Sequence, residues 1–465
     1  MSAGCGGGGG AATAVPVRLT GRRSAMGAAA AAPPWFHLVP GDRPQVLAVA
    51  RSALFEVTSS LYDELASGDP AAHAELAAAV PPADPSQFGD VGPLPPPRAI
   101  SLNVAQACNL ACTYCYADEG RFHGRSRKMS QAVARRAVDE LLAGVVPGER
   151  GLVGFIGGEP LLNRPVVHAT VAYAAERAAR LGVGVGFSIT TNGTLVDASD
   201  VTLFRSQPFA VTVSVDGGAA THDRHRSRHG GAGSWQATIA NLRPLLDDPG
   251  LSRVSARATV TRDDLDVARR VADIAAAGFG EIGVSPARTG PDPSVVLRGP
   301  DWAKYLDGLV GAAEAELDRL RREGPSWGFQ FSNLGNALGE IHRGTCRPLP
   351  CGSAYGYLSV DVDGNYATCH RTVGEDRFRM GAIGDLDDAA RRAFLEPRLV
   401  DRQEPCRSCW ARYLCGGGCH AEVDEVGREG CDMIRGWLDY CLSRYPVVRA
   451  ELPELFPSIQ EVAAP

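Results

Sequence analysis

The chain has 465 residues, of which 45% are hydrophobic and 22% charged, and its formal net charge at pH 7 is −6. This is the composition of a globular protein, and the length suits about two or three domains. The acidic balance argues against a broad nucleic-acid surface, and no apolar run is long enough to cross a bilayer. We therefore expect neither nucleic acid nor a membrane as partner.

The chain begins with a Gly- and Ala-rich stretch, residues 1–33, which we expect to be a disordered tail. Arg22 and Arg23 leave a twin-arginine export signal open as an alternative. Residues 34–80 follow as a small module. In it, "WFHLV" and "PQVLAVARSALFEV" predict strands and "SSLYDELASG" predicts a capped amphipathic helix. A Pro-rich linker separates this module from the rest of the chain.

From Ala99 onward, apolar strand segments alternate with helical segments. The six predicted strands are "AISLNVAQ", "GLVGFIGG", "GVGFSITTNGT", "FAVTVSVDG", "SARATVT" and "EIGVSPA". This alternation predicts a parallel sheet that is closed or partly closed as a barrel, and a long helix over 301–323 ends it. Chemistry in such folds lies at the carboxyl ends of the strands.

The cysteines are unusually numerous and grouped. Thirteen are present, and most lie within residues 108–115, 346–369 and 406–431. A secreted disulfide protein is usually small and spreads its cysteines along the chain. Tight groups in a long chain indicate metal ligation in a reducing compartment, so we expect a cytoplasmic protein. Cys5 and Cys441 fit no group and are expected to be ordinary cysteines.

The first group directly follows the first barrel strand, as Cys108, Cys112 and Cys115 in a Cys-x3-Cys-x2-Cys pattern. Three thiolates on a four-iron cubane leave one iron open, and an open iron can chelate an amine and a carboxylate. Two other interpretations remain: redox-idle cysteines, or a zinc site with a distant fourth ligand.

This spacing, with the aromatic Tyr114 before the last cysteine, resembles the signature of the radical S-adenosylmethionine (radical SAM) enzymes. In that family the three cysteines hold a 4Fe-4S cluster, on which S-adenosylmethionine binds. Reductive cleavage of the cofactor gives methionine and a 5′-deoxyadenosyl radical, which abstracts hydrogen from an unactivated carbon. The resemblance implies both cofactors here, and an α/β fold with a partial (β/α)6 barrel over residues 96–325.

Other strand-end segments resemble the family's cofactor site. In "GGEP" the glycines let backbone approach a ligand closely, and Glu159 is implied to bind the cofactor's amino group. Ser214 and Arg257 are implied to meet its carboxylate or ribose, although a packing or capping role for both stays open. The cofactor-binding residues implied by the resemblance are Tyr114, Gly157, Gly158, Glu159, Pro160, Thr191, Asn192, Ser214 and Arg257.

The C-terminal region, residues 326–445, carries eight cysteines, enough for two further cubanes. Its spacing resembles the SPASM extension of peptide-modifying radical SAM enzymes, which implies three 4Fe-4S clusters in all. One implied auxiliary set is Cys346, Cys351, Cys369 and Cys419; the other is Cys406, Cys409, Cys415 and Cys431. The alternative is a pair of zinc knuckles in a non-catalytic interaction protein.

The strings "SNLGNALGEIHRGTCRP" and "EPCRSCWARYLCGGGCHAEV" are similar to the maturation proteins of quinohemoprotein amine dehydrogenases. That resemblance implies a polypeptide substrate, the dehydrogenase small subunit, in which cysteine sulfur is joined to Asp or Glu side-chain carbons as thioethers. An electron donor such as flavodoxin or ferredoxin is implied too. A related maturase that forms cyclophane or other carbon–carbon crosslinks in a precursor peptide remains the alternative.

Two further features follow from the same resemblance. His370, Asp361 and Asp363 are candidates for a base that removes a proton from the substrate. Sulfatase-maturing relatives have Asp directly after the cysteine that corresponds to Cys369, and His370 at this position argues against a formylglycine-forming enzyme. The 34–80 module either recognises a leader or substrate chain by strand addition or only packs against the barrel. The tail, residues 446–465, matches no motif.

Overall fold

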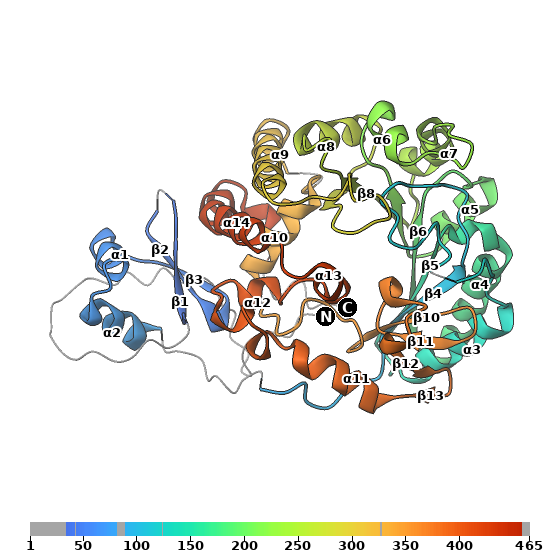
Figure 1. Cartoon of the computed structure of the whole chain (residues 1–465), viewed down its shortest axis with the longest axis horizontal. Coiled ribbons are helices and arrows are strands. Elements are labelled where there is room, and N and C mark those ends of the chain that lie inside the picture. The colour runs from blue at the N-terminus through green and yellow to red at the C-terminus, as the bar shows by residue number, and fades with distance from the viewer. Residues whose placement is uncertain (1–33, 42, 81–88, 123, 326–327, 458–465) are drawn as a thin grey trace.

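A computed structural model describes most of the chain (Figure 1). The described residues are 34–41, 43–80, 89–122, 124–325 and 328–457. The expected tail at 1–33 and the end of the expected 446–465 tail lie outside them.

One large sheet organises the molecule, with the strand order β13-β12-β11-β10-β4-β5-β6-β7-β8-β9. Its six central parallel strands coincide with the six strands predicted from sequence, which confirms the α/β partial barrel. These are β4 (Ala99–Ala105), β5 (Arg150–Gly157), β6 (Gly184–Thr191), β7 (Phe209–Ser214), β8 (Arg253–Val260) and β9 (Ile282–Pro286).

Helices follow the strands and cover the outer face of the curved sheet, as Figure 1 shows. They are α3 (Gln131–Ala143), α4 (Arg164–Leu181), α5 (Ala198–Ser206), α6 (Ala219–His225), α7 (Trp235–Asp247), α8 (Val267–Ala276) and α9 (Asp301–Glu323). The start of α3 shows why they form where they do. Ser130 caps it by accepting the Val133 backbone N–H at 3.3 Å, and apolar side chains such as Val138 and Leu141 are buried on one face.

The C-terminal region is joined to the barrel through the same sheet. Strand β10 (Tyr357–Val360) pairs in parallel with β4, and β11 (Asn365–Ala367), β12 (Arg379–Ala382) and β13 (Asp385–Leu386) continue antiparallel. The buried hydroxyls of Ser101 and Ser359 are 2.9 Å apart across the β4–β10 junction. The sequence predicts strand-like pieces here, but not that one of them extends the barrel sheet.

Helices and short turns make up the rest of this region. The helices are α10 (Ser332–His342), α11 (Asp388–Leu395), α12 (Arg412–Cys415), α13 (His420–Val426) and α14 (Cys431–Glu451). The 3₁₀ turns of the chain are η1 (Val49–Arg51), η3 (Pro160–Asn163), η4 (His370–Thr372), η5 (Asp376–Phe378), η6 (Glu396–Arg398), η7 (Val400–Arg402), η8 (Cys406–Ser408) and η9 (Pro453–Leu455). In Figure 1, α13 lies inside the ring that the strands and α14 form.

The N-terminal module has its own antiparallel sheet and its own small core. Strands β1 (Phe36–Val39), β2 (Gln45–Ala48) and β3 (Ala53–Glu56) pack with α1 (Ser59–Ala66) and α2 (Pro70–Ala79). The module lies to one side of the barrel in Figure 1 and contacts the C-terminal region through His37. The His37 ring stacks on Trp410 with centroids 3.7 Å apart, and its Nε2 is 2.6 Å from Asp439 Oδ1.

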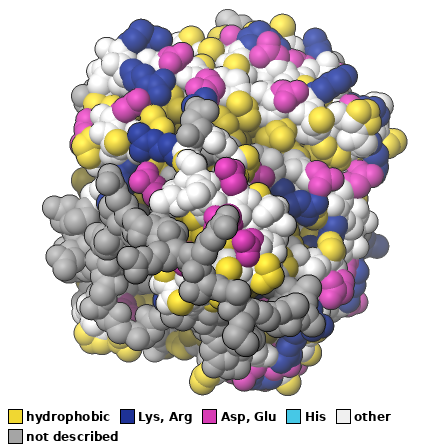
Figure 2. Space-filling view, turned by 90° about the vertical axis from the view of Figure 1, so that its left-hand side faces the viewer, with side chains coloured by type: hydrophobic (Ala, Val, Ile, Leu, Met, Phe, Trp, Pro, Cys, Tyr) yellow, Lys and Arg dark blue, Asp and Glu magenta, His cyan; other side chains and the backbone are white. Residues whose placement is uncertain are grey.

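Charge is mixed on the surface of the molecule that Figure 2 presents. Basic and acidic side chains are interspersed there, and neither sign forms a broad patch on the described part of this face. Within the described residues, none of the helices combines the length and the apolar character needed to cross a lipid bilayer.

Candidate functional site

The three cysteines of the β4 loop line a single cavity of about 290 Å³ at the carboxyl ends of the barrel strands. The structure brings most of the predicted cofactor residues to the same cavity, although they come from separate strands. The predicted residues that line it are Cys108, Cys112, Tyr114, Cys115, Gly157, Gly158, Thr191, Asn192 and Ser214. Sequence analysis therefore identified the main part of this wall.

The thiols of this cavity are suited to a soft cation. Cys108, Cys112 and Cys115 are unpaired and partly buried. Burial raises the pKa of the Cys108 thiol to about 12, and the adjacent Glu159, Cys112 and Cys115 add to the rise. The pKa of Cys112 is also raised, mainly by burial. Thiolates in such surroundings need a positive partner, and an iron–sulfur cluster with its soft iron ions provides one.

A mononuclear metal site has no equivalent support. In the ranges that the structure covers, no three His, Cys, Asp or Glu side chains are grouped so that they could hold one metal ion. A cubane has four irons, so its thiolate ligands are spread more widely than those of a single ion. The donor set of the β4 loop is therefore better matched to a cluster than to zinc.

Gly157 and Gly158 allow two loops to pass in contact beside the cavity. Gly157 has φ +149°, and a Cβ on it would lie 2.3 Å from the carbonyl oxygen of Ala105. A Cβ on Gly158 would lie 2.3 Å from the carbonyl oxygen of Ala107. Any larger residue would push the β5 loop away from the cysteine loop. The close approach that the sequence predicted is thus made here to the chain's own backbone.

Glu159 and Pro160, the rest of this motif, are buried and do not line the cavity. The Glu159 carboxylate accepts hydrogen bonds from Thr191 Oγ1 at 2.8 Å and from the Asn192 backbone N–H at 2.7 Å. Burial raises its pKa, and these hydrogen bonds oppose the rise. The carboxylate therefore fixes the end of β6 against the β5 loop, which corrects the expectation that it contacts the cofactor directly.

Arg257 also lies away from the cavity lining. Its Nη1 donates to Ser332 Oγ at 3.0 Å, and its Nη2 is 3.9 Å from Glu281. The position implied from sequence for a cofactor-binding arginine is therefore wrong in this structure, because the side chain is directed to the start of α10. A different arginine lines the cavity.

That arginine is Arg226, at the end of α6. It is buried, and its Nη1 donates to the Tyr114 hydroxyl at 2.8 Å. Its Nε is buried without any hydrogen-bond partner, beside a cavity that the side chain helps to line. A buried cation with an unpaired donor provides a site for an anionic group of a ligand. Sequence reasoning missed it, because periodicity alone does not separate Arg226 from the exposed Arg224 nearby.

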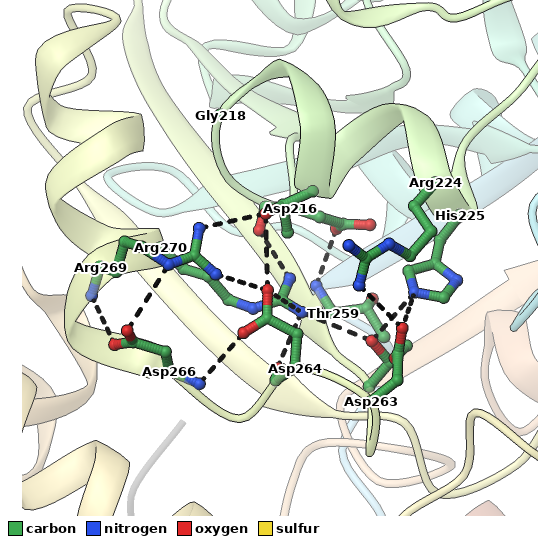
Figure 3. A network of polar contacts seen from close by, with 12 residues as sticks. Asp216, Gly218, Arg224, His225, Thr259, Asp263, Asp264, Asp266, Arg269 and Arg270 are labelled. Carbon is green, nitrogen blue, oxygen red and sulfur yellow. Dashed lines mark hydrogen bonds and ion pairs between the residues drawn. The ribbon is translucent and has the colours of Figure 1, made fainter.

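A buried polar network holds this wall in place, and Figure 3 shows its centre. Asp216 accepts from the Tyr114 hydroxyl and, at 2.9 Å, from the Thr259 backbone N–H. Its own carbonyl accepts from Arg270 Nη1 at 2.8 Å. Because the partners come from the cysteine loop, β8 and α8, the network fixes the loop relative to the barrel. Tyr114, predicted as an aromatic cavity residue, therefore also has a specific polar partner.

The C-terminal cysteines form a second centre. Cys406, Cys409, Cys415 and Cys431 line one cavity of about 90 Å³, together with Cys419. Burial raises the pKa of Cys406 to about 11, and the neighbouring Cys415, Cys431 and Cys409 thiols add to this while Arg428 opposes it. The four cysteines that the SPASM resemblance implies as one set are thus neighbours in space.

The other implied set is only partly assembled from free thiols. Burial raises the pKa of Cys351, and the nearby Cys419 and Cys369 raise it further. Cys346, in contrast, is disulfide-bonded in this structure, fully buried, and 3.4 Å from the Ala50 carbonyl oxygen of the N-terminal module. It faces the module rather than the other three cysteines, which differs from the expected four-thiolate set.

None of the three candidate bases lines a cysteine cavity. Asp361 Oδ1 accepts from the backbone N–H groups of Asp363 and Asn365 at 2.9 and 2.8 Å, so it stabilises the β10–β11 turn. Asp363 forms an exposed pair with Arg127 at 2.5 Å. His370 Nδ1 lies 3.1 Å from the Tyr357 hydroxyl, and burial lowers the pKa of His370 to about 4.

Comparison with known proteins agrees with this geometry. Residues 102–260 match the family model of the Radical SAM superfamily. A serine-type anaerobic sulfatase-maturating enzyme of Klebsiella aerogenes is 24% identical over 344 residues, which are 70% of this chain and 80% of that protein. The mycofactocin maturase MftC of Mycobacterium ulcerans is 29% identical over 343 residues, 70% of this chain and 83% of that protein.

Solved structures match over most of the described fold. The structure of native anSMEcpe with bound AdoMet has a TM-score of 0.63, at 18% identity, and covers 76% of this chain and 99% of that one. Native anSMEcpe with bound AdoMet and the Cp18Cys peptide has a TM-score of 0.62, at 18% identity, with 76% and 99% covered. The fold of this chain is therefore that of radical SAM proteins with a C-terminal extension.

Proposed function

We propose that this radical SAM protein, a relative of sulfatase-maturating enzymes and of a mycofactocin maturase, is an enzyme that modifies a ribosomally made polypeptide. The proposed reaction forms intrapeptidyl thioethers between cysteine sulfur and side-chain carbons of Asp or Glu. Maturation of an amine dehydrogenase small subunit is the proposed context, as the C-terminal sequence strings suggest.

The observation that carries the proposal is the cavity at the barrel mouth. It combines three unpaired thiols, a buried arginine with an unpaired donor, and backbone from three strand ends. Bound to a 4Fe-4S cluster and reduced, S-adenosylmethionine supplies a 5′-deoxyadenosyl radical that abstracts a substrate hydrogen atom. The protein's task is then to orient the reacting groups and to exclude water.

The residues of the chain divide this task. We propose that Cys108, Cys112 and Cys115 hold the cluster, and that Arg226 binds the cofactor's carboxylate through its unpaired Nε. Gly157 and Gly158 keep the β5 loop against the cysteine loop, so the cavity stays narrow. Thr191, Asn192 and Ser214 provide polar groups on the lining.

The C-terminal cysteines would hold two auxiliary 4Fe-4S clusters, three clusters in all. Cys406, Cys409, Cys415 and Cys431 are the proposed ligands of one. Cys351, Cys369 and Cys419, with Cys346 when its sulfur is reduced, are those of the other. Thioether formation removes one hydrogen from carbon and one from sulfur. The radical takes the carbon hydrogen, the thiol proton leaves to solvent, and an auxiliary cluster takes the remaining electron.

The N-terminal module has two edge strands, β1 and β3, which makes strand addition by a leader or substrate chain possible in geometric terms. Recognition of the polypeptide is its proposed role. Flavodoxin or ferredoxin is the proposed electron donor, and the cytoplasm the proposed compartment.

Two alternatives are kept. A related maturase could form cyclophane or other carbon–carbon crosslinks in a precursor peptide, and the relationship to a mycofactocin maturase favours a peptide substrate of this kind. A zinc-binding interaction protein is the alternative of another class. Iron and zinc analysis of protein purified without oxygen separates it, because three cubanes require about twelve irons per chain.

The experiment is coexpression with small cysteine-rich polypeptides encoded beside this chain, followed by mass spectrometry. A thioether lowers the polypeptide mass by about two hydrogens per link, and fragmentation locates the cysteine. A mass loss without any modified cysteine would favour the carbon–carbon alternative. An unchanged mass for every such polypeptide, with the cofactor cleaved, would contradict the thioether assignment.

A further inference from the structure

A carboxylate held between two arginines lies at the junction of the two cysteine regions. Glu422, on α13, accepts from Arg371 Nη1 at 3.1 Å through one oxygen and lies 3.3 Å from Arg288 Nε through the other. Arg371 belongs to η4, directly after Cys369, and Arg288 follows β9. Three segments far apart in the sequence therefore meet at one carboxylate.

The position of this cluster is what makes it functional. Glu422 and Arg288 line both the β4-loop cavity and the cavity of the second cysteine set. Arg371 lines the β4-loop cavity and an outer cavity of about 590 Å³, which also reaches Cys115 and Tyr116. The three side chains are 14 to 21% exposed. A polypeptide that approaches the radical site from the outer cavity must pass them.

The cluster has more positive than negative charge. Two guanidinium groups face one carboxylate, and their other contacts are neutral: Arg371 Nη2 donates to Thr289 Oγ1 at 3.3 Å, and Arg288 Nη1 to the Glu429 carbonyl at 3.0 Å. The guanidinium of Arg371 stacks on Tyr116 and that of Arg288 on Trp302, each 4.6 Å from the ring centroid. Aromatic stacking holds both arginines without neutralising them.

Other acidic groups near the outer cavity have different partners. Glu375 pairs with Arg377 at 2.9 Å, and Asp118 pairs with Arg121 at 3.1 Å. Neither contacts the cluster in any interaction described. The surplus charge at Arg371 and Arg288 is therefore available to a second carboxylate, and in a partly buried site such a pairing is strong.

We propose that Arg371 and Arg288 bind an acidic side chain of the substrate polypeptide, and that Glu422 occupies their donors until the substrate arrives. This inference rests on the proposed function and specifies its substrate contact. Binding the carboxylate there places the adjacent methylene carbon next to the β4-loop cavity, where hydrogen abstraction takes place. Arg371, Arg288 and Glu422 are thus positioning residues for the side chain that becomes crosslinked.

The cofactor's own carboxylate is a poorer occupant of this site. Arg226 faces Cys112 and is placed inside the β4-loop cavity, whereas Arg371 and Arg288 lie on its border with the C-terminal cysteines. We therefore assign the two anionic groups to different arginines. The assignment predicts that variants of one site leave binding at the other unchanged.

The test is anaerobic equilibrium dialysis of the reconstituted full chain with labelled N-acetyl-glutamate N-methylamide, a probe that has only a side-chain carboxylate. Saturable binding is expected in the wild type, with affinity about tenfold or more lower in Arg371→Gln and in Arg288→Gln. Glu422→Gln should bind the probe several-fold more tightly, because a competing carboxylate has been removed. The matched control is Arg377→Gln, in the outer cavity, which should bind like the wild type.

Two further probes identify the source of the carboxylate. The glutamine analogue of the probe should not bind, and N-acetyl-alanine, with only a chain-terminal carboxylate, should bind more weakly than the glutamate probe. Equal or stronger binding of N-acetyl-alanine would overturn the assignment to a side chain. Dialysis of S-adenosylmethionine should give the same affinity in Arg371→Gln and the wild type.

The proposal is overturned if Glu422→Gln weakens probe binding or leaves it unchanged, or if Arg371→Gln binds like the wild type. Thermal melts identify a variant that has lost its fold, and Arg371→Lys, which keeps the charge but not the planar group, then serves in its place with intermediate affinity expected. Cofactor cleavage is measured separately on each protein. Its absence in the wild type would contradict the proposed function, whereas probe binding tests the positioning residues alone.

Discussion

The two cysteine regions reach similar groupings of thiols by different routes. In the β4 loop, eight residues bring three thiols to one cavity, because the loop leaves a buried parallel strand and is held by Asp216 and Arg226. In the C-terminal region, four thiols that share a cavity come from η8, α12 and α14, spread over 406–431. Local spacing defines the first centre, and tertiary wrapping defines the second.

This difference has a functional consequence. The β4-loop cavity contains a buried arginine with an unpaired donor, and it is attached to the rigid core of the barrel. The C-terminal centre is bordered by the N-terminal module and by the arginine–glutamate cluster around Glu422. The first centre is therefore suited to cofactor cleavage and the second to the substrate. Changes in one should leave the other largely intact.

The largest effect is expected for Cys112→Ala. Loss of one of three thiols should abolish cofactor cleavage to methionine and 5′-deoxyadenosine, and should lower iron by about four per chain while the C-terminal clusters remain. Chromatography of the products and iron analysis measure both. Cys441→Ala, at a free cysteine in the hydrophobic core, is the control and should keep full activity and iron. Equal product yields in the two variants would remove the assigned role.

The complementary change is Cys409→Ala. It should abolish crosslinking of the polypeptide but preserve reductive cleavage of the cofactor in the absence of substrate, because only the second centre is altered. The two products are measured in parallel by mass spectrometry and by chromatography. Loss of both activities together would show that the two regions do not work separately.

Arg226→Gln sharpens the comparison from the cofactor side. Removing a buried cation from the ligand's carboxylate should weaken S-adenosylmethionine binding by about 10- to 100-fold. Equilibrium dialysis measures it. Arg224→Gln, on the same helix but exposed and paired with Asp263, is the matched control and should bind like the wild type. A similar loss in both variants would indicate a general effect of helix α6.

A pH effect on stability should come from the barrel region. Burial lowers the pKa of His222 to about 3, and its Nε2 lies 2.9 Å from Ser234 Oγ. The unfolded chain binds a proton near pH 6.5 that the folded chain refuses, so this contribution to stability is complete above that pH and is lost as pH falls below it. Each unit below is worth about 1.4 kcal/mol. Thermal melts from pH 7 to 5 should fall less steeply in His222→Gln; parallel curves would exclude this source.

The smallest effect is expected for Asp363→Asn. Its pair with Arg127 is exposed on both sides, so the change should leave both melting temperature and crosslinking rate within error of the wild type. The result separates position from chemistry, because the sequence alone offered Asp363 as a base. A loss of crosslinking would return it to that role.

Sequence patterns predicted the elements that repeat and the motifs that are local. The six barrel strands, the helix over 301–323 and the cavity lining at Gly157, Gly158 and Ser214 are where the patterns predicted them. The patterns failed where a side chain's direction decides its role. Arg257 lies on a predicted strand but turns to Ser332, whereas Arg226 lies in a run of polar residues and turns inward.

Long-range contacts account for the rest. Nothing in the local sequence shows that β10 pairs with β4, that Cys346 faces the N-terminal module, or that Glu422 lies between Arg371 and Arg288. Each depends on segments that are distant in the chain. The Glu159 motif is intermediate: its place at the end of β5 was predicted, but its hydrogen bonds to β6 require the sheet to be assembled.

The central claim is that the three thiols of the β4 loop hold a cluster with one iron open for S-adenosylmethionine. The most direct measurement is electron paramagnetic resonance of the reduced, anaerobically reconstituted Cys409→Ala variant, before and after addition of that cofactor. We expect the signal of the β4-loop cluster to change on addition, and 5′-deoxyadenosine to accumulate with methionine in equal amounts. An unchanged spectrum and no 5′-deoxyadenosine, with the iron present, would contradict the account.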